Sequence, residues 1–163
     1  MRRRLNLTML AVAALGLSLI APASAASARS AAIEAFAITS DMHGKCLATN
    51  GDNVEMQTCR GTGNQLWFRE GDKLVNRAER HCLDVRNGEL DAPAQAVGDC
   101  HGLANQRWNW GLPDDHRIIT QVNNQCLSIQ NEGEGRDGAG INLRDCRPGF
   151  GVAWQKWSRN DNP

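Results

Sequence analysis

The 163-residue sequence contains no tyrosine and only three phenylalanines, and aromatic residues make up 5% of it. It has no C-x-x-C pair of the kind that zinc sites use, and its four histidines form no H-E-x-x-H spacing. The G-x-S-x-G turn of many serine hydrolases and a phosphate-binding loop are also missing. These absences argue against the common zinc, serine-hydrolase and nucleotide-dependent enzymes. We therefore predict no catalytic residue, no metal and no cofactor.

The sequence also lacks an excess of either charge, because 18 Lys and Arg residues balance 18 Asp and Glu residues. Removing Arg2, Arg3 and Arg4, which precede an apolar leader, lowers the basic count from 18 to 15 and leaves a net charge of about −3. Nucleic-acid binding draws affinity from a basic surface through counterion release, and attraction to anionic lipids needs such a surface too. We expect neither nucleic-acid binding nor membrane insertion.

The longest apolar run lies near the N-terminus, at residues 7–20, and carries no charge. Residues 21–25 then supply a proline and the small residues of an A-x-A cleavage site. This order is typical of a secretory signal peptide, and the run is shorter than the roughly 20 residues of a membrane span. We expect residues 1–25 to be a signal peptide, 26–34 a short linker and 35–163 the folded domain of a secreted, extracellular protein. A twin-arginine signal is the alternative, although the rest of that motif is missing.

Six cysteines follow the leader, and all belong to a pattern that occurs three times. Each copy starts with C-L-x-[β-branched residue], contains a second cysteine and ends with Gln-x-Trp. The first cysteines are Cys46, Cys82 and Cys126, the second are Cys59, Cys100 and Cys146, and the Gln-x-Trp tryptophans are Trp67, Trp108 and Trp157. An internal repeat of this kind indicates a fold of three equivalent units.

Each copy contains short β-tolerant runs separated by Gly, Asn, Asp and Thr clusters that favour turns. We expect about four strands per copy and about twelve in all, and no segment has helical periodicity. The expected strands of the first copy are residues 36–39, 45–49, 54–59 and 65–70, and the leading strands of the next copies are residues 73–76 and 117–122. Residues 131–140 lengthen the third copy and contain four glycines. Their acidic residues are interpreted as a solvated turn and not as a calcium site.

The two cysteines of a copy lie on successive predicted strands joined by one turn, which favours the pairings Cys46–Cys59, Cys82–Cys100 and Cys126–Cys146. Six cysteines allow fifteen connectivities, so the sequence leaves other pairings open. Each local bridge would close a loop of roughly 15 to 20 residues, worth on the order of 3 kcal/mol. One copy cannot bury its apolar face, whereas three can close a barrel, and we expect the three Gln-x-Trp tryptophans to fill its core.

Three C-L-x-[V/I/T] segments and three Gln-x-Trp signatures closely resemble the ricin-type (R-type) lectin β-trefoil, also called the family 13 carbohydrate-binding module. The resemblance covers about residues 36–158. It implies an all-β trefoil of three pseudo-symmetric four-stranded lobes, each with an internal disulfide and up to one shallow sugar pocket. In such a pocket an Asp two residues after the first Cys accepts hydrogen bonds from the sugar. An aromatic residue two before the second Cys stacks on the ring, an Asn before Gln-x-Trp donates, and the Gln steadies the Asp.

The three lobes match this set unequally. Lobe two keeps Asp84, Asn105 and Gln106 but has Gly98 in place of the aromatic residue. Lobe one keeps Asn64 and Gln65 but has Ala48 for the Asp and Gln57 for the aromatic residue. Lobe three has Ser128 for the Asp, Arg144 for the aromatic residue and Trp154 for the Asn. The resemblance therefore implies one sugar site, in lobe two, without the usual stacking platform.

Two further residues are candidates for sugar binding. His101 follows Cys100 directly and is expected to flank the Asp84 pocket, unless it is a solvated loop residue. Trp154 has opposite parity to Trp157 on a predicted strand, so we expect its side chain to point away from the core. It would then be either a binding platform or a residue packed under the loop at residues 147–152.

The sequence thus predicts a secreted, monomeric, non-catalytic module whose partner is a glycan or polysaccharide. The alternative is a trefoil that has lost sugar recognition and binds a protein partner, as a toxin-delivery subunit, an inhibitor or a surface interaction protein. The missing stacking residues favour this alternative, and the intact polar set of lobe two favours glycan binding.

Overall fold

The computed structural model describes residues 34–110, 115–148 and 152–162, and within these ranges twelve strands form one sheet. The predicted signal peptide and almost all of the predicted linker lie outside the described residues. The strands are β1 (Phe36–Ser40), β2 (Cys46–Asn50), β3 (Asn53–Gln57), β4 (Leu66–Glu70), β5 (Lys73–Asn76), β6 (Cys82–Val85), β7 (Ala94–Val97), β8 (Trp108–Trp110), β9 (Ile118–Thr120), β10 (Cys126–Ile129), β11 (Ala139–Arg144) and β12 (Trp157–Asn160). No helix in the described ranges is long and apolar enough to cross a membrane.

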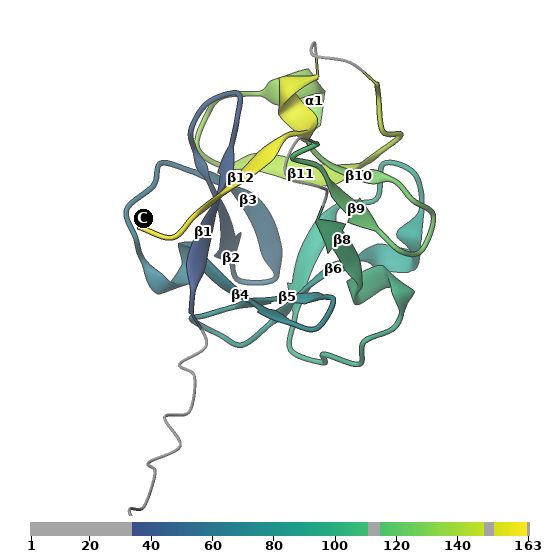
Figure 1. The fold of residues 1–163 in the computed structure, drawn as a ribbon, viewed down its shortest axis with the longest axis horizontal. Helices are drawn as coiled ribbons and strands as arrows, with labels where there is room; N and C mark the ends of the chain where they lie inside the picture. Colours follow the sequence, from purple (N-terminus) through teal and green to yellow (C-terminus); the bar gives the residue numbers. More distant parts are fainter. Residues whose placement is uncertain (1–33, 111–114, 149–151, 163) are drawn as a thin grey trace, which may run out of the picture. The chain divides into compact units, whose positions relative to one another are not determined.

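The strands group into three lobes of four, arranged around a common centre (Figure 1). Lobe one contains β1–β4, lobe two β5–β8 and lobe three β9–β12. The outer strands build a barrel through the pairs β12–β1, β1–β4, β4–β5 and β8–β9. The remaining contacts of the barrel are backbone hydrogen bonds from Trp108 N to Asp72 O at 2.9 Å and from Trp157 N to His116 O at 2.7 Å.

The inner strands of each lobe form a hairpin, namely β2–β3, β6–β7 and β10–β11. The three hairpins touch one another, because β3 pairs with both β7 and β11, and an isolated bridge joins Pro93 to Asn142. This arrangement confirms the prediction of an all-β trefoil with three four-stranded lobes.

The core contains the same tryptophan–leucine contact in each of the three lobes. Each Gln-x-Trp tryptophan is almost completely buried, and its indole N–H donates to the carbonyl of the leucine that follows the first cysteine of its lobe. The pairs are Trp67 with Leu47 at 2.9 Å, Trp108 with Leu83 at 3.0 Å, and Trp157 with Leu127 at 3.0 Å. A buried indole needs such a partner for its N–H, so each tryptophan fixes its hairpin over the barrel as well as filling the core.

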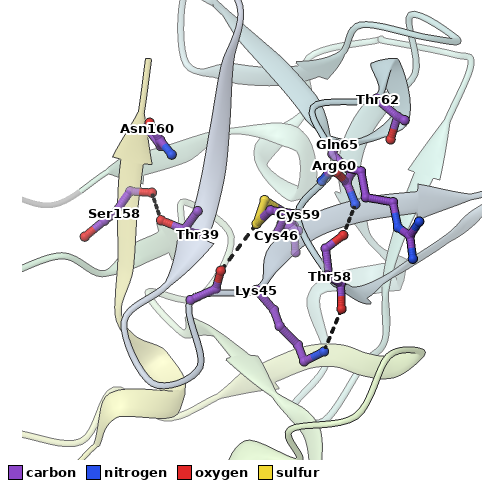
Figure 2. The surroundings of a disulfide bond; sticks show 12 residues. Thr39, Lys45, Cys46, Thr58, Cys59, Arg60, Thr62, Gln65, Ser158 and Asn160 are labelled. Carbon is purple, nitrogen blue, oxygen red and sulfur yellow. Dashed lines mark hydrogen bonds between the residues drawn. A yellow bond between two sulfur atoms is a disulfide. The ribbon is translucent and has the colours of Figure 1, made fainter. Parts of the chain in front are cut away.

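The disulfides are the three local ones that the repeat favours. Cys46–Cys59, Cys82–Cys100 and Cys126–Cys146 have Cα–Cα distances of 5.1, 5.5 and 5.1 Å. Figure 2 shows the first of them, beside the bond of 3.2 Å from Lys45 Nζ to Thr58 Oγ1. Each bridge ties the first strand of a hairpin to the loop that follows the second strand.

The glutamines of the Gln-x-Trp motifs do not lie on strands. The prediction that a strand starts at Gln65 was therefore wrong by one residue. They end the short 3₁₀ turns η1 (Gly63–Gln65), η3 (Ala104–Gln106) and η4 (Ala153–Gln155). Each buried side-chain amide bonds twice to the backbone of the loop around the second cysteine. Gln65 Nε2 donates to Thr58 O at 2.9 Å, and its Oε1 accepts from Arg60 N at 2.7 Å (Figure 2). The repeated glutamine thus holds the loop around the second cysteine in all three lobes.

The lengthened segment of lobe three contains one short turn of helix, α1 (Gln130–Gly133), and is fastened to lobe one. His43 Nε2 lies 2.8 Å from Gly133 O, and Asp137 pairs with Lys45 and Thr58. The pKa of Asp137 lies below its ordinary value, mainly because Lys45 donates a hydrogen bond to its carboxylate. Within the described ranges no cluster of His, Cys, Asp and Glu could hold a metal ion.

Candidate functional site

A polar cluster in lobe two is centred on Asp84, in the middle of β6. Its neighbours Leu83 and Val85 point into the core, so the alternation of a strand places Asp84 on the opposite face of the hairpin. Only 2% of Asp84 is exposed. In the hairpin register Asp84 lies directly opposite Gln95 of β7.

Two side-chain amides hold the Asp84 carboxylate. Gln95 Nε2 donates to Asp84 Oδ1 at 2.9 Å, and Asn105 Nδ2 donates to Asp84 Oδ2 at 2.8 Å. Hydrogen bonds to a charged acceptor are among the stronger ones in proteins, so they fix the orientation of the carboxylate. Each oxygen of an ionised carboxylate can accept about two hydrogen bonds, which leaves acceptor capacity on both. The structure therefore brings together Asp84 and Asn105, as predicted, and adds Gln95.

Gln106 has a different role from the one that the family resemblance implied. It is fully buried, its Nε2 donates to Asp99 O at 2.8 Å, and its Oε1 accepts from Gly102 N at 2.9 Å. These bonds hold the loop that precedes Asn105 instead of steadying Asp84 directly. His101 lies in that loop, is exposed, and accepts a hydrogen bond from Leu103 N on its Nδ1 at 3.1 Å.

The strand register moves the stacking position of lobe two by one residue. Gln57 pairs with the first cysteine of lobe one and Arg144 with that of lobe three, and in both lobes the second cysteine follows two residues later. In lobe two the residue opposite Cys82 is Val97, and Cys100 follows three residues later. The sequence spacing, two residues before Cys100, therefore placed the stacking residue at Gly98. The strand register instead places Val97 at the position that Gln57 and Arg144 occupy in the other lobes. The platform here is small and aliphatic.

A shallow hollow of about 260 Å³ lies beside the cluster, and Gln95 lines it. Arg86, Val97 and Gly98 line it together with Gln95, and Asp52 and Asn53 approach from lobe one. Arg86 Nη2 lies 3.5 Å from Gln95 Oε1. Gln95 thus connects the buried carboxylate to an open surface. Sequence analysis missed Gln95 and Arg86, because their places depend on the register set by the turn between β6 and β7.

The corresponding positions of lobe three also lie close together. Ser128, Arg144 and Trp154 line one hollow of about 170 Å³. Trp154 belongs to the turn η4 and not to a strand, so the parity argument for its direction was wrong. It is half-buried and partly packed against the core. Residues 149–151, which form half of the loop predicted to cover it, lie outside the described residues.

Comparison with known proteins identifies the family. A family model described as a ricin-type beta-trefoil lectin domain matches residues 34–108 and 73–163. Nigrin b of Sambucus nigra is 33% identical over 70 residues, which make up 40% of this chain and 12% of Nigrin b. The matched segment therefore spans only a small part of that relative.

Solved structures show the same fold at lower identity. ThreeFoil, a designed 3-fold symmetric protein, is 24% identical with a TM-score of 0.68, over 78% of this chain and 98% of its own. A ricin B-like lectin of Macrolepiota procera, solved in complex with lactose, is 16% identical with a TM-score of 0.67, over 78% of this chain and 95% of its own. With the family model covering most of the sequence, the chain belongs to the ricin-type β-trefoil lectin family, a family of carbohydrate-binding domains.

Proposed function

We propose that this protein is a secreted, non-catalytic glycan-binding module whose sugar site is the cluster of Asp84, Gln95 and Asn105 in lobe two. The observation that carries the proposal is the carboxylate of Asp84, held between two amides at 2.8 and 2.9 Å beside an open hollow. The three disulfides support export, because such bridges persist in oxidising compartments.

The chemistry of the cluster suits sugar hydroxyls. Gln95 and Asn105 each donate an N–H to Asp84, and Gln95 Oε1 accepts from Arg86 Nη2 at 3.5 Å. An amide oxygen has two lone pairs, so both amides keep capacity to accept from a sugar hydroxyl. Arg86 supplies donors at the rim of the hollow. A hydroxyl can both donate and accept, and fixed groups of both kinds discriminate its position on a ring.

Because the cluster has no aromatic stacking residue, we expect this single site to bind sugar weakly. An aromatic stack adds about 0.5–1.5 kcal/mol beyond its buried area, and Val97 cannot provide it. A millimolar sugar complex has only about 4 kcal/mol in total. We therefore expect detection to need a dense display of sugars, where multivalency raises the apparent affinity.

Asp84→Asn tests the site with little change in volume. The variant removes the charge and one acceptor, so either Gln95 or Asn105 loses its partner and the cluster loses its fixed orientation. Since a hydrogen bond to a charged group contributes about 1.5–3 kcal/mol, we expect glycan binding to fall roughly 10- to 100-fold. The measurement is a glycan array that includes lactose, read with the mature protein and the variant side by side.

Glu89→Gln is the matched control, because Glu89 is an exposed acidic residue of the same lobe outside the cluster. It should bind like the unchanged protein. Equal array signals for Asp84→Asn and Glu89→Gln would remove the lobe-two site from consideration. An array without any signal at high protein concentration would favour the alternative of a protein partner.

A further inference from the structure

The turn of each hairpin contacts the hairpin of another lobe, and these contacts, which we call seams, occur at equivalent places. The residue pairs that form them are Asn53–Gln95, Pro93–Asn142 and Gly140–Glu55. The second member of each pair holds the same place in its own hairpin, opposite the residue that lies two after the first cysteine of the lobe. The side chains of the three seams can therefore be compared directly.

Each seam also has an aspartate in the turn, one to three residues before the paired residue. Two of these aspartates bind the neighbouring lobe. Asp91 Oδ1 of lobe two lies 2.6 Å from Arg144 Nη1 of lobe three. Asp137 of lobe three forms an ion pair with Lys45 of lobe one and accepts a hydrogen bond from Thr58 N at 2.9 Å. In these two seams the carboxylate of the turn is therefore already used within the protein.

Asp52 is the corresponding aspartate of the seam between lobes one and two, and its carboxylate forms no hydrogen bond or ion pair with any described residue. Its backbone is held in place, because Ala96 N donates to Asp52 O at 2.8 Å and the next residue, Asn53, pairs with Gln95. The side chain is exposed and lines the hollow of about 260 Å³ beside the lobe-two cluster. This seam therefore presents an acceptor at a fixed place that a ligand can use.

Arg86 lines the same hollow and has no ion-pair partner in the described ranges either. Its Nη2 lies 3.5 Å from Gln95 Oε1, which is long for a hydrogen bond. The hollow thus contains one carboxylate and one guanidinium that are not paired with each other, so it offers an acceptor and donors while its two charges balance. Such a set suits the hydroxyls of a neutral sugar better than an acidic or a basic ligand.

Gln95 joins this hollow to the proposed sugar site. It donates to Asp84 Oδ1 at 2.9 Å and also lines the hollow, whereas Asp84 and Asn105 are not among the described residues that line it. A sugar ring held at Asp84 and Asn105 therefore leaves the groups of the hollow to whatever is attached to that ring. Asp52 comes from another lobe, so it lies beyond the residues that one lobe can supply.

From these observations we infer that the ligand of lobe two is at least a disaccharide, whose second, neutral ring crosses the seam and donates a hydroxyl hydrogen bond to Asp52 of lobe one. The inference rests on the proposed function and specifies the ligand of that same site. It departs from the family resemblance, which implied a separate pocket within each lobe, because here lobe one supplies an acceptor to the site of lobe two.

The test compares Asp52→Ala with the unchanged protein on an array that displays sugars at equal density. The probes are galactose, glucose and mannose as single rings, and lactose, cellobiose and mannobiose as neutral disaccharides, with disaccharides of glucuronic acid as the charged arm. The variant should bind the best neutral disaccharide roughly 5- to 10-fold more weakly and the matching single ring within about twofold. Asp52→Asn keeps an amide oxygen as an acceptor and should recover part of the loss.

Asp72→Ala is the matched control, because Asp72 is an exposed turn residue whose backbone carbonyl also accepts from a neighbouring lobe, from Trp108 N at 2.9 Å. It should bind like the unchanged protein, and neither alanine variant should change the melting temperature. If Asp52→Ala and Asp72→Ala bind all disaccharides equally while Asp84→Asn loses binding, the inference is wrong and the proposed function stands. Unchanged binding by Asp84→Asn would instead overturn the lobe-two site itself. A stronger signal from the glucuronic acid disaccharides than from the neutral ones would contradict a neutral second ring.

Discussion

Replacement of Trp108 by alanine is expected to lower the free energy of unfolding by about 3–5 kcal/mol. Trp108 is 1% exposed, lies in the main core cluster and donates its indole N–H to Leu83 O. Alanine removes one of the largest fully buried side chains of the protein and leaves a cavity between the hairpin and the barrel of lobe two. Chemical denaturation of the oxidised protein, followed by circular dichroism, measures the change. Since domains of this size are stable by about 5–15 kcal/mol, the loss is a large fraction of the total.

Trp108→Phe and the alanine variants of the other two core tryptophans serve as comparisons for Trp108→Ala. Trp108→Phe keeps most of the ring but removes the donor to Leu83 O, so it should cost less than alanine and still about 1–3 kcal/mol. Trp67→Ala and Trp157→Ala should match Trp108→Ala, because all three residues occupy equivalent places with equivalent bonds. A loss below about 1 kcal/mol in any lobe would show that the three lobes do not share one core.

Removing the lobe-two disulfide with the double substitution Cys82→Ala and Cys100→Ala is expected to cost about 3 kcal/mol. The bridge joins residues separated by 18 positions, and in the chain-entropy account its loss lets the unfolded chain explore more conformations. The measurement is again the midpoint of denaturant unfolding, with the sugar-binding assay as a second reading. Binding should weaken as well, because Cys100 anchors the loop that leads to Asn105.

The equivalent pairs provide the control for the disulfide. Cys46–Cys59 and Cys126–Cys146 span 13 and 20 positions, so removing either should destabilise the protein by a similar amount. Unchanged stability in the double variant would contradict a structural role for the bridge. Peptide mapping that links cysteines of different lobes would contradict the fold itself.

The fold could be predicted from the sequence because each lobe repeats the same few constraints. A leucine after the first cysteine and the tryptophan of Gln-x-Trp recur in order, and the structure joins them by one hydrogen bond in every lobe. The local disulfides follow from the same repeat. Strand ends were less predictable, since Gln65 reads as part of a strand but ends a 3₁₀ turn, where its amide clamps a loop.

The binding residues were predictable only where they lie at a fixed distance from a repeated residue. Asp84 and Asn105 keep such distances from Cys82 and Gln106, and the structure brings them within 2.8 Å of each other. Gln95 lies across a turn whose length differs between lobes, so only the register reveals it. For the same reason the extra residue before Cys100 moved the predicted stacking position from Val97 to Gly98.

If the side-chain amides around Asp84 bind the sugar, one NMR experiment detects the contact directly. The best glycan from the array is titrated into ¹⁵N-labelled protein, and the side-chain NH₂ signals of Gln95 and Asn105 are followed. Both signals should move together with a single saturation curve, with backbone changes at Arg86 and Val97. If the glycan binds while these four residues keep their signals unchanged, the sugar is held elsewhere and the account of lobe two is wrong.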